Sequence, residues 1–159
     1  MQRYIAVVGG GTCSAEEGAA AERIGVLLAR ADAVLVCGGL SGVMEAACRG
    51  ARREGGITVG LLPGTDRATA NPHVAVAIAT GLGELRNGLV VRAADAIIAV
   101  GGEFGTLSEI GFALKLGKRV VGLGTWDLGH RAEAILRATT AEDAARLALE
   151  EPTGAQPGR

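Results

Sequence analysis

The chain has 159 residues, of which 48% are hydrophobic and 3% aromatic, and it carries 26 glycines and a formal net charge of −1. This length suits one domain with a substantial core, and the composition is typical of a nucleotide-type α/β fold rather than of a disordered or fibrous chain. The balanced charge and the scarcity of aromatic side chains argue against a nucleic-acid partner, and no apolar run is long enough to span a bilayer, so we expect no membrane partner and a cytoplasmic location.

Short apolar runs alternate with helical segments along the chain. Strands are predicted over residues 4–8, 33–37, 57–62, 74–78, 96–100 and 119–123, with a short seventh strand over 134–138. Helices are predicted over residues 14–30, 43–54, 104–116 and 140–150, and the segment 80–87 leads into a further helix that ends near residue 93. Ser14, with Glu17 three residues later, has the form of a capping box at the start of the first helix.

This alternation of strand and helix predicts right-handed crossovers and a parallel sheet. We therefore expect an α/β fold: a three-layer, Rossmann-like sandwich with a parallel sheet of about seven strands in a single domain. The domain is expected to cover residues 1–150, followed by a flexible C-terminal tail over residues 151–159. By analogy with Rossmann folds, the first six strands are expected in the order 3-2-1-4-5-6.

Glycine-rich loops follow four of the predicted strands, after Val8, Cys37, Ile78 and Val100. The carboxyl ends of parallel strands meet at one edge of an open sheet, where such folds bind ligands. The loop over residues 101–105 also opens directly onto a helix, whose first backbone N–H groups are free and suit a phosphate. The sequence therefore predicts a site for a phosphorylated small molecule at this edge.

A carboxylate lies close to this predicted phosphate site. Glu109 falls about one turn into the helix, near enough to reach whatever the loop holds, and a carboxylate is a poor group for binding an anion, which suggests a second task. His73 and His130 lie in predicted loops without metal-site spacing, so no metal site is expected. The three cysteines lack a CxxC spacing and are expected to be buried free thiols.

Residues 101–109, Gly-Gly-Glu-Phe-Gly-Thr-Leu-Ser-Glu, resemble the PGGxGTxxE motif of the LONELY GUY (LOG) family, and Arg86-Asn87 stands where that family has an Arg-Lys pair. The similarity is closer to the short branch that contains the molybdenum-cofactor carrier proteins. The stretches that carry it are residues 38–47, 61–64, 80–87 and 105–110. The resemblance covers about residues 4–150.

In LOG enzymes the matching arginine and glutamate release the base from a cytokinin or adenosine 5′-monophosphate, so the resemblance implies Arg86 and Glu109 as catalytic residues if this protein is an enzyme. It also implies a homodimer or homotetramer, and a bound molybdenum cofactor or nucleotide, with no cofactor required. The candidate ligand- and phosphate-binding residues are Gly10, Gly11, Ser14, Gly38, Gly39, Gly42, Thr80, Gly81, Arg86, Asn87, Gly101, Gly102, Gly105 and Thr106.

Three positions depart from the LOG motif: Gly101 replaces its proline, Glu103 its second glycine, and Asn87 its lysine. Glu103 adds negative charge beside the predicted phosphate and Asn87 removes positive charge, which suits the carrier branch, thought to hold a phosphorylated pterin–metal cofactor without turning it over. The preferred hypothesis is therefore a binding protein for a phosphorylated nucleotide-like or pterin ligand. The alternatives are a LOG-type nucleoside 5′-monophosphate phosphoribohydrolase and a nucleotide-sensing module.

Simpler interpretations of the same residues stay open. Arg86 and Glu109 would form a structural ion pair between two helices, and Leu40 and Met44 would lie in the core or at a subunit contact. Lysine decarboxylase chemistry is excluded as an expectation, because it needs a pyridoxal phosphate lysine and both lysines of the chain lie at the far end of a helix from the glycine loops.

Overall fold

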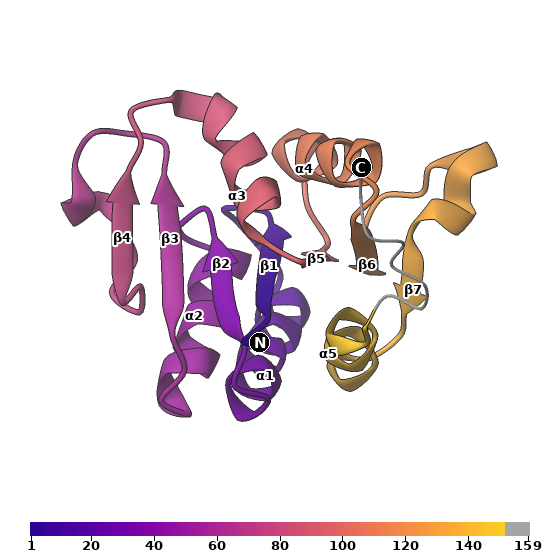
Figure 1. Ribbon diagram of the computed structural model, residues 1–159, viewed down its shortest axis with the longest axis horizontal. Coiled ribbons are helices and arrows are strands. Elements are labelled where there is room, and N and C mark those ends of the chain that lie inside the picture. The colour runs from indigo at the N-terminus through magenta and orange to yellow at the C-terminus, as the bar shows by residue number, and fades with distance from the viewer. Residues whose placement is uncertain (152–159) are drawn as a thin grey trace.

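Seven parallel strands form one sheet between two layers of helices (Figure 1). The structure is a computed structural model and describes residues 1–151. The strands are β1 (Tyr4–Gly9), β2 (Val34–Cys37), β3 (Thr58–Leu62), β4 (Val76–Ala79), β5 (Ala96–Val100), β6 (Arg119–Leu123) and β7 (Leu136–Ala138). The helices are α1 (Ala15–Arg30), α2 (Val43–Arg53), α3 (Asn87–Ala93), α4 (Phe104–Lys115) and α5 (Ala141–Leu149), with 3₁₀ turns η1 (Arg67–Thr69), η2 (Gly83–Arg86) and η3 (Gly129–Ala134).

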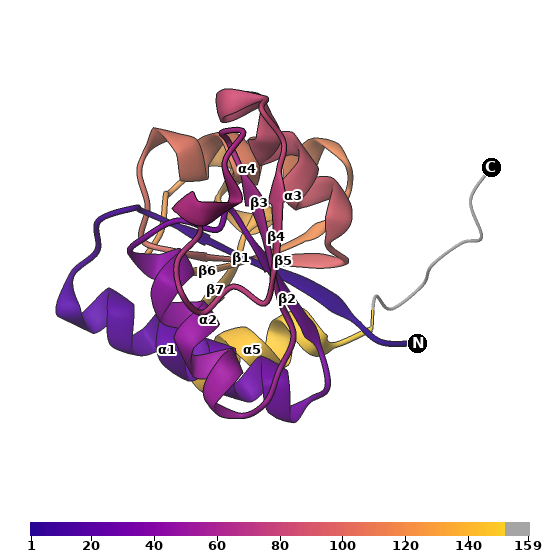
Figure 2. The same cartoon turned by 90° about the vertical axis from the view of Figure 1, so that its left-hand side faces the viewer.

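The layers follow from the apolar character of the central strands. Every residue of β5 and the four middle residues of β1 are buried, as expected for strands covered on both faces. One face is covered by α1, α2 and α5 and the other by α3 and α4, and Figure 2 shows the sheet between these two layers. The predicted three-layer, single-domain α/β fold is confirmed, and the predicted tail, apart from Glu151, lies outside the described residues.

Local signals in the sequence fix the ends of several elements. The capping box is confirmed, because the Ser14 hydroxyl accepts from the Glu17 N–H at 3.1 Å and the Glu17 carboxylate accepts from the Ser14 N–H at 3.0 Å. The segment before α3 agrees with the prediction that residues 80–87 lead into a helix, since residues 83–86 form the 3₁₀ turn η2 and the α-helix runs from Asn87 to Ala93.

The predicted strand order is wrong at the fourth strand. The observed order is β4-β3-β2-β1-β5-β6-β7, so β4 lies at the edge beside β3, and β5 rather than β4 pairs with β1. The link from β3 to β4 contains only the short turn η1, which carries the chain to the neighbouring position, whereas η2 and α3 supply the crossover that returns to the centre. The burial of the strands agrees with this order, because β4 at the edge is half exposed and β5 at the centre is fully buried.

Two helical glycines set the approach of α1 to α2. A Cβ atom at Gly25 would lie 2.0 Å from the carbonyl oxygen of Ala47, and one at Gly50 would lie 1.9 Å from the carbonyl oxygen of Glu22. A side chain at either position is incompatible with this separation of the helices. The contact places the loops that precede α1 and α2 next to each other at the carboxyl edge of the sheet.

The strand order reverses between β1 and β5. From β1 the chain builds outward through β2, β3 and β4, and from β5 it builds in the other direction through β6 and β7. The loops after β1 and β5 therefore diverge and leave a crevice, which is the usual ligand position in open parallel sheets. Within residues 1–151, no helix combines the length and the apolar character needed to cross a lipid bilayer.

Candidate functional site

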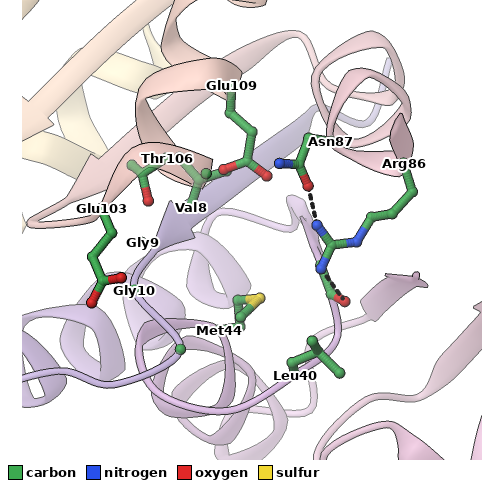
Figure 3. A pocket seen from close by; sticks show the side chains of 13 residues that line it. Val8, Gly9, Gly10, Leu40, Met44, Arg86, Asn87, Glu103, Thr106 and Glu109 are labelled. Atoms are coloured by element: carbon green, nitrogen blue, oxygen red, sulfur yellow. Dashed lines mark hydrogen bonds between the residues drawn. The ribbon is translucent and has the colours of Figure 1, made fainter. Parts of the chain in front are cut away.

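A cavity of about 230 Å³ opens in this crevice, at the carboxyl edge of the sheet (Figure 3). Its walls come from the loops after β1, β2 and β5, the start of α2, the junction of η2 and α3, and the first turns of α4. The lining residues are Val8, Gly9, Gly10, Gly11, Gly38, Leu40, Met44, Arg86, Asn87, Glu103, Gly105, Thr106 and Glu109.

Arg86 is the only cationic side chain of this lining and is 8% exposed. Its Nη2 donates to the carbonyl oxygen of Gly38 at 3.3 Å, and its Nη1 donates to the side-chain oxygen of Asn87. Its Nε has no hydrogen-bond partner, and it is the one fully buried side-chain nitrogen or oxygen within residues 1–151 in that state. A buried N–H group without a partner is unfavourable, so the guanidinium is ready to bind an acceptor.

The backbone around Arg86 is shaped to admit it. A Cβ atom at Gly38 would lie 2.6 Å from Arg86 Nη2 and 2.9 Å from Met44 Sδ, so a side chain there would displace the guanidinium. Asn87 donates from its side-chain nitrogen to the Ser108 hydroxyl at 3.2 Å, which ties the start of α3 to α4. These contacts fix the position of Arg86 in the wall of the cavity.

Glu109 lies on α4 in the same wall and is 6% exposed. Figure 3 shows its carboxylate between Thr106 and Asn87, with Arg86 beyond Asn87. Burial raises the pKa of Glu109 to about 7, and the positive charge of Arg86 opposes this rise. None of the ion pairs or side-chain hydrogen bonds in the described chain involves Glu109, so the interpretation as a structural ion pair with Arg86 is not supported.

The start of α4 supplies the groups suited to an anion. Glu103 is the N-cap residue, and its side chain makes no capping hydrogen bond, so the first N–H groups of this 12-residue helix have no side-chain partner there. Gly105 and Thr106 line the cavity next to it. Free N–H groups at a helix N-terminus attract phosphate and other anions. The Glu103 carboxylate, exposed on the opposite side of the cavity from Arg86 in Figure 3, works against such binding.

The cavity brings together about half of the residues singled out in the sequence. Glu109 and seven of the ligand-binding candidates line it, namely Gly10, Gly11, Gly38, Arg86, Asn87, Gly105 and Thr106. The other seven do not line it: Ser14, Gly39, Gly42, Thr80, Gly81, Gly101 and Gly102.

The seven outlying candidates have local structural tasks. All five glycines among them have positive φ, which favours glycine at the turns they occupy. The Thr80 hydroxyl donates to the carbonyl oxygen of Leu62 at 2.6 Å. Ser14 caps α1 and lines a separate cavity of about 520 Å³, which is larger but contains no cationic side chain and two carboxylates, Glu16 and Glu17. We therefore place the candidate site in the cavity of Arg86.

Sequence reasoning missed the apolar part of the site. Val8, Leu40 and Met44 are apolar residues of the lining, with Leu40 and Met44 below Arg86 and Val8 near Glu109 in Figure 3. The pattern of apolar residues identifies such side chains as buried, but a residue that faces a cavity has the same pattern as one that faces the core. The position of Met44 at the second residue of a helix that follows a glycine loop is the signal that the sequence offers.

Comparisons with known proteins agree with this architecture. A protein from Rippkaea orientalis, described as a molybdenum cofactor binding protein, superposes with a TM-score of 0.87 at 35% identity, covering 92% of this chain and 95% of that chain. The molybdenum cofactor carrier protein from Chlamydomonas reinhardtii superposes with a TM-score of 0.81 at 30% identity, again over 92% of this chain and 95% of the other.

Sequence comparison gives the family itself. An uncharacterized protein from Archaeoglobus fulgidus is 46% identical over 119 residues, which are 75% of this chain and 78% of the relative. The family model described as the SLOG cluster4 family matches residues 2–155. The predicted resemblance to LOG-like and molybdenum-cofactor-carrier-like proteins is confirmed, and the chain belongs to the SLOG cluster4 family.

Proposed function

We propose that this protein binds a phosphorylated nucleotide-like or pterin ligand in the cavity of Arg86, as a carrier or binding protein. The observation that carries the proposal is the buried guanidinium with a free Nε–H, set in the crevice between β1 and β5. A buried N–H without an acceptor costs free energy, and a phosphorylated ligand supplies several acceptor oxygens that would remove this cost. The similarity to proteins described as binding or carrying molybdenum cofactor supports the same class of ligand.

The polar and apolar parts of the lining suit two different parts of such a ligand. The phosphate would lie against the start of α4, at Gly105 and Thr106, within reach of Arg86. A flat heterocycle would pack on the apolar side formed by Leu40 and Met44. The cavity of about 230 Å³ is smaller than most small-molecule sites, which measure roughly 300–1,000 Å³, so part of the ligand would extend beyond its mouth.

A molybdenum cofactor fits the same division, because it is a phosphorylated pterin. Arg86 and the start of α4 would hold its phosphate, and the apolar side would contact its ring system. The metal chemistry belongs to the cofactor when it is bound, and the task of these residues is to bind and orient it.

Ligand binding is tested with the purified protein by thermal unfolding. Adenosine 5′-monophosphate, guanosine 5′-monophosphate and ribose 5-phosphate are added separately, and mass spectrometry identifies small molecules released on denaturation. We expect at least one phosphorylated compound to raise the melting temperature by roughly 5–10 °C, corresponding to about 2–3 kcal/mol at a hundredfold excess over Kd. The Arg86→Gln variant should lose this shift, and an unchanged shift in that variant would place the ligand elsewhere.

One observation favours the phosphoribohydrolase as a second candidate. Arg86 and Glu109 line the same cavity, and the pKa of Glu109, about 7, is near the value at which a carboxyl group serves as an acid or base at neutral pH. A chromatographic assay for free base decides between the two functions. Release of base by the wild type that disappears in Glu109→Gln establishes the enzyme, and binding without release leaves the carrier.

A further inference from the structure

The charges that line the cavity do not favour an anion. Arg86 contributes one positive charge, and Glu103 and Glu109 contribute two carboxylates. With both carboxylates ionised, a phosphate monoester dianion would enter a site of net negative charge. The free N–H groups at the start of α4 and the Nε of Arg86 attract it, but one carboxylate must still be compensated.

Glu109 is the carboxylate that the ligand would approach inside the cavity. It is 6% exposed, it faces the cavity, and it has no hydrogen-bond or ion-pair partner among the described residues. Glu103, in contrast, is exposed to solvent, where water screens its charge. The negative charge that must be neutralised is therefore that of buried Glu109. Its pKa of about 7 allows it to take up a proton near neutral pH.

We propose that Glu109 takes up one proton from solvent when a phosphorylated ligand binds, so that its neutral carboxyl group donates a hydrogen bond to a ligand oxygen. This inference rests on the proposed function. A protonated Glu109 adds a further buried donor to the site, beside the Nε–H of Arg86. One proton changes the wall from repelling the ligand to binding it, and the neutral acid needs no counter-ion of its own.

The groups that face Glu109 are few. Arg86 from η2 lowers its pKa, Cys37 at the end of β2 lies near enough for the two groups to influence each other, and Glu103 shares the cavity from the start of α4. The β1 segment contributes only Val8 and glycines, and α2 contributes Met44. A proton that the site gains near neutral pH therefore resides on Glu109, because Glu103 is exposed and arginine stays charged.

The proposal predicts proton uptake that calorimetry measures directly. Adenosine 5′-monophosphate is titrated into the wild-type protein at about pH 8, where a phosphate monoester is fully ionised, in two buffers of different ionisation enthalpy and with a chelator present. We expect about one proton taken up per ligand bound, and an affinity that falls about tenfold per pH unit from about pH 7.5 to about pH 8.5. Guanosine 5′-monophosphate and ribose 5-phosphate serve as further probes.

Two variants test the assignment to Glu109. Glu109→Gln removes the titrating group but keeps a hydrogen-bond donor, so its ligand binding should take up no proton and should not change with pH over the same range. Glu84→Gln removes an exposed carboxylate of η2 outside the cavity, and it should bind as the wild type does.

The outcomes separate this inference from the proposed function. Wild-type binding without proton uptake overturns the inference and leaves the binding function intact. The same holds if added magnesium, rather than a proton, restores the affinity at high pH. If none of the three phosphorylated probes binds at either pH, the proposed function and the inference both fail.

Discussion

Glu109 shows how burial changes the chemistry of a single side chain. The carboxyl group would ordinarily titrate near 4.5, and burial raises its pKa to about 7. The folded protein therefore holds this proton more tightly than the unfolded chain does. The resulting contribution to stability is fully present below about pH 4.5 and is lost as the pH rises through about 7.

We predict that Glu109→Gln changes the pH dependence of folding stability. The wild type should lose ~3 kcal/mol of unfolding free energy through this residue between about pH 4.5 and about pH 8, because ionised Glu109 is buried without a partner. The variant lacks this loss and should be the more stable protein at about pH 8. Urea unfolding of both proteins at the two pH values measures the difference, and an equal difference at both values would contradict the prediction.

The site residues that sequence reasoning found are those whose chemistry depends on residue type. Arg86, Glu109 and the start of α4 follow from a charged pair and a glycine loop in a motif. The contacts of Gly38 could not be derived in this way, because the closeness of its backbone to Arg86 and Met44 depends on how β2, η2 and α2 come together. The same limit explains why the sequence indicates Ser14 and Thr80 as ligand-binding candidates. In the structure the side chain of each makes a hydrogen bond to the backbone outside the cavity.

At the scale of elements, the contact between α1 and α2 leaves no room for a larger side chain at its two glycines. Its two glycines, Gly25 and Gly50, weaken each helix on their own, since glycine is a poor helix former. The gain is a close approach of the two backbones, which supports the loops that build the cavity. From the sequence alone, a glycine within a helix indicates only a weak helix.

We predict opposite effects for two glycine-to-alanine substitutions. Gly50→Ala should destabilise the protein by about 1–3 kcal/mol, because its methyl group would lie 1.9 Å from the Glu22 carbonyl oxygen. Gly111→Ala in α4 is the matched control: no atom lies within 4 Å of the Cβ position, and this variant should gain up to about 1 kcal/mol. Chemical denaturation measures both, and a stable Gly50→Ala protein would mean that the helices can separate at little cost.

Element types were predictable because apolar runs and glycine turns recur along the chain. The position of β4 was not, since a strand of four residues with small and branched side chains suits the centre or the edge of a sheet. In the structure β4 lies at the edge of the sheet. Val76 and Ile78 are exposed there, and no crossover helix precedes the strand.

The whole molecule leaves one helical layer with an apolar outer surface. Leu85 and Leu89 lie four residues apart in η2 and α3, Phe112 lies in α4 four residues before its C-cap residue Leu116, and all four side chains are exposed. The two helices pack side by side on the same face of the sheet (Figure 1). Such stripes on neighbouring helices resemble a buried helix face without its partner. We propose that this face pairs with a second copy of the chain, as the expected homodimer or as part of a homotetramer.

A charge placed in this surface should dissociate the assembly. Leu85 is 78% exposed, and Leu85→Glu should convert the oligomer to monomers in analytical ultracentrifugation at micromolar concentration, because an unpaired carboxylate would be buried at the contact. Ile57→Glu is the control, since Ile57 is also exposed, at 46%, but precedes β3. A monomeric wild type, or an oligomer that tolerates Leu85→Glu, would disprove the proposed contact.

The reversal of strand order between β1 and β5 also determines when the cavity can exist. Its walls include Val8 near the beginning of the chain, Gly38 after β2 and Glu109 two thirds of the way along the chain, so the cavity is complete only when these segments have come together. No fragment that ends before α4 contains the complete lining. A bound molecule would therefore stabilise the complete fold. It would slow the global unfolding of the described chain and so protect that chain from proteases.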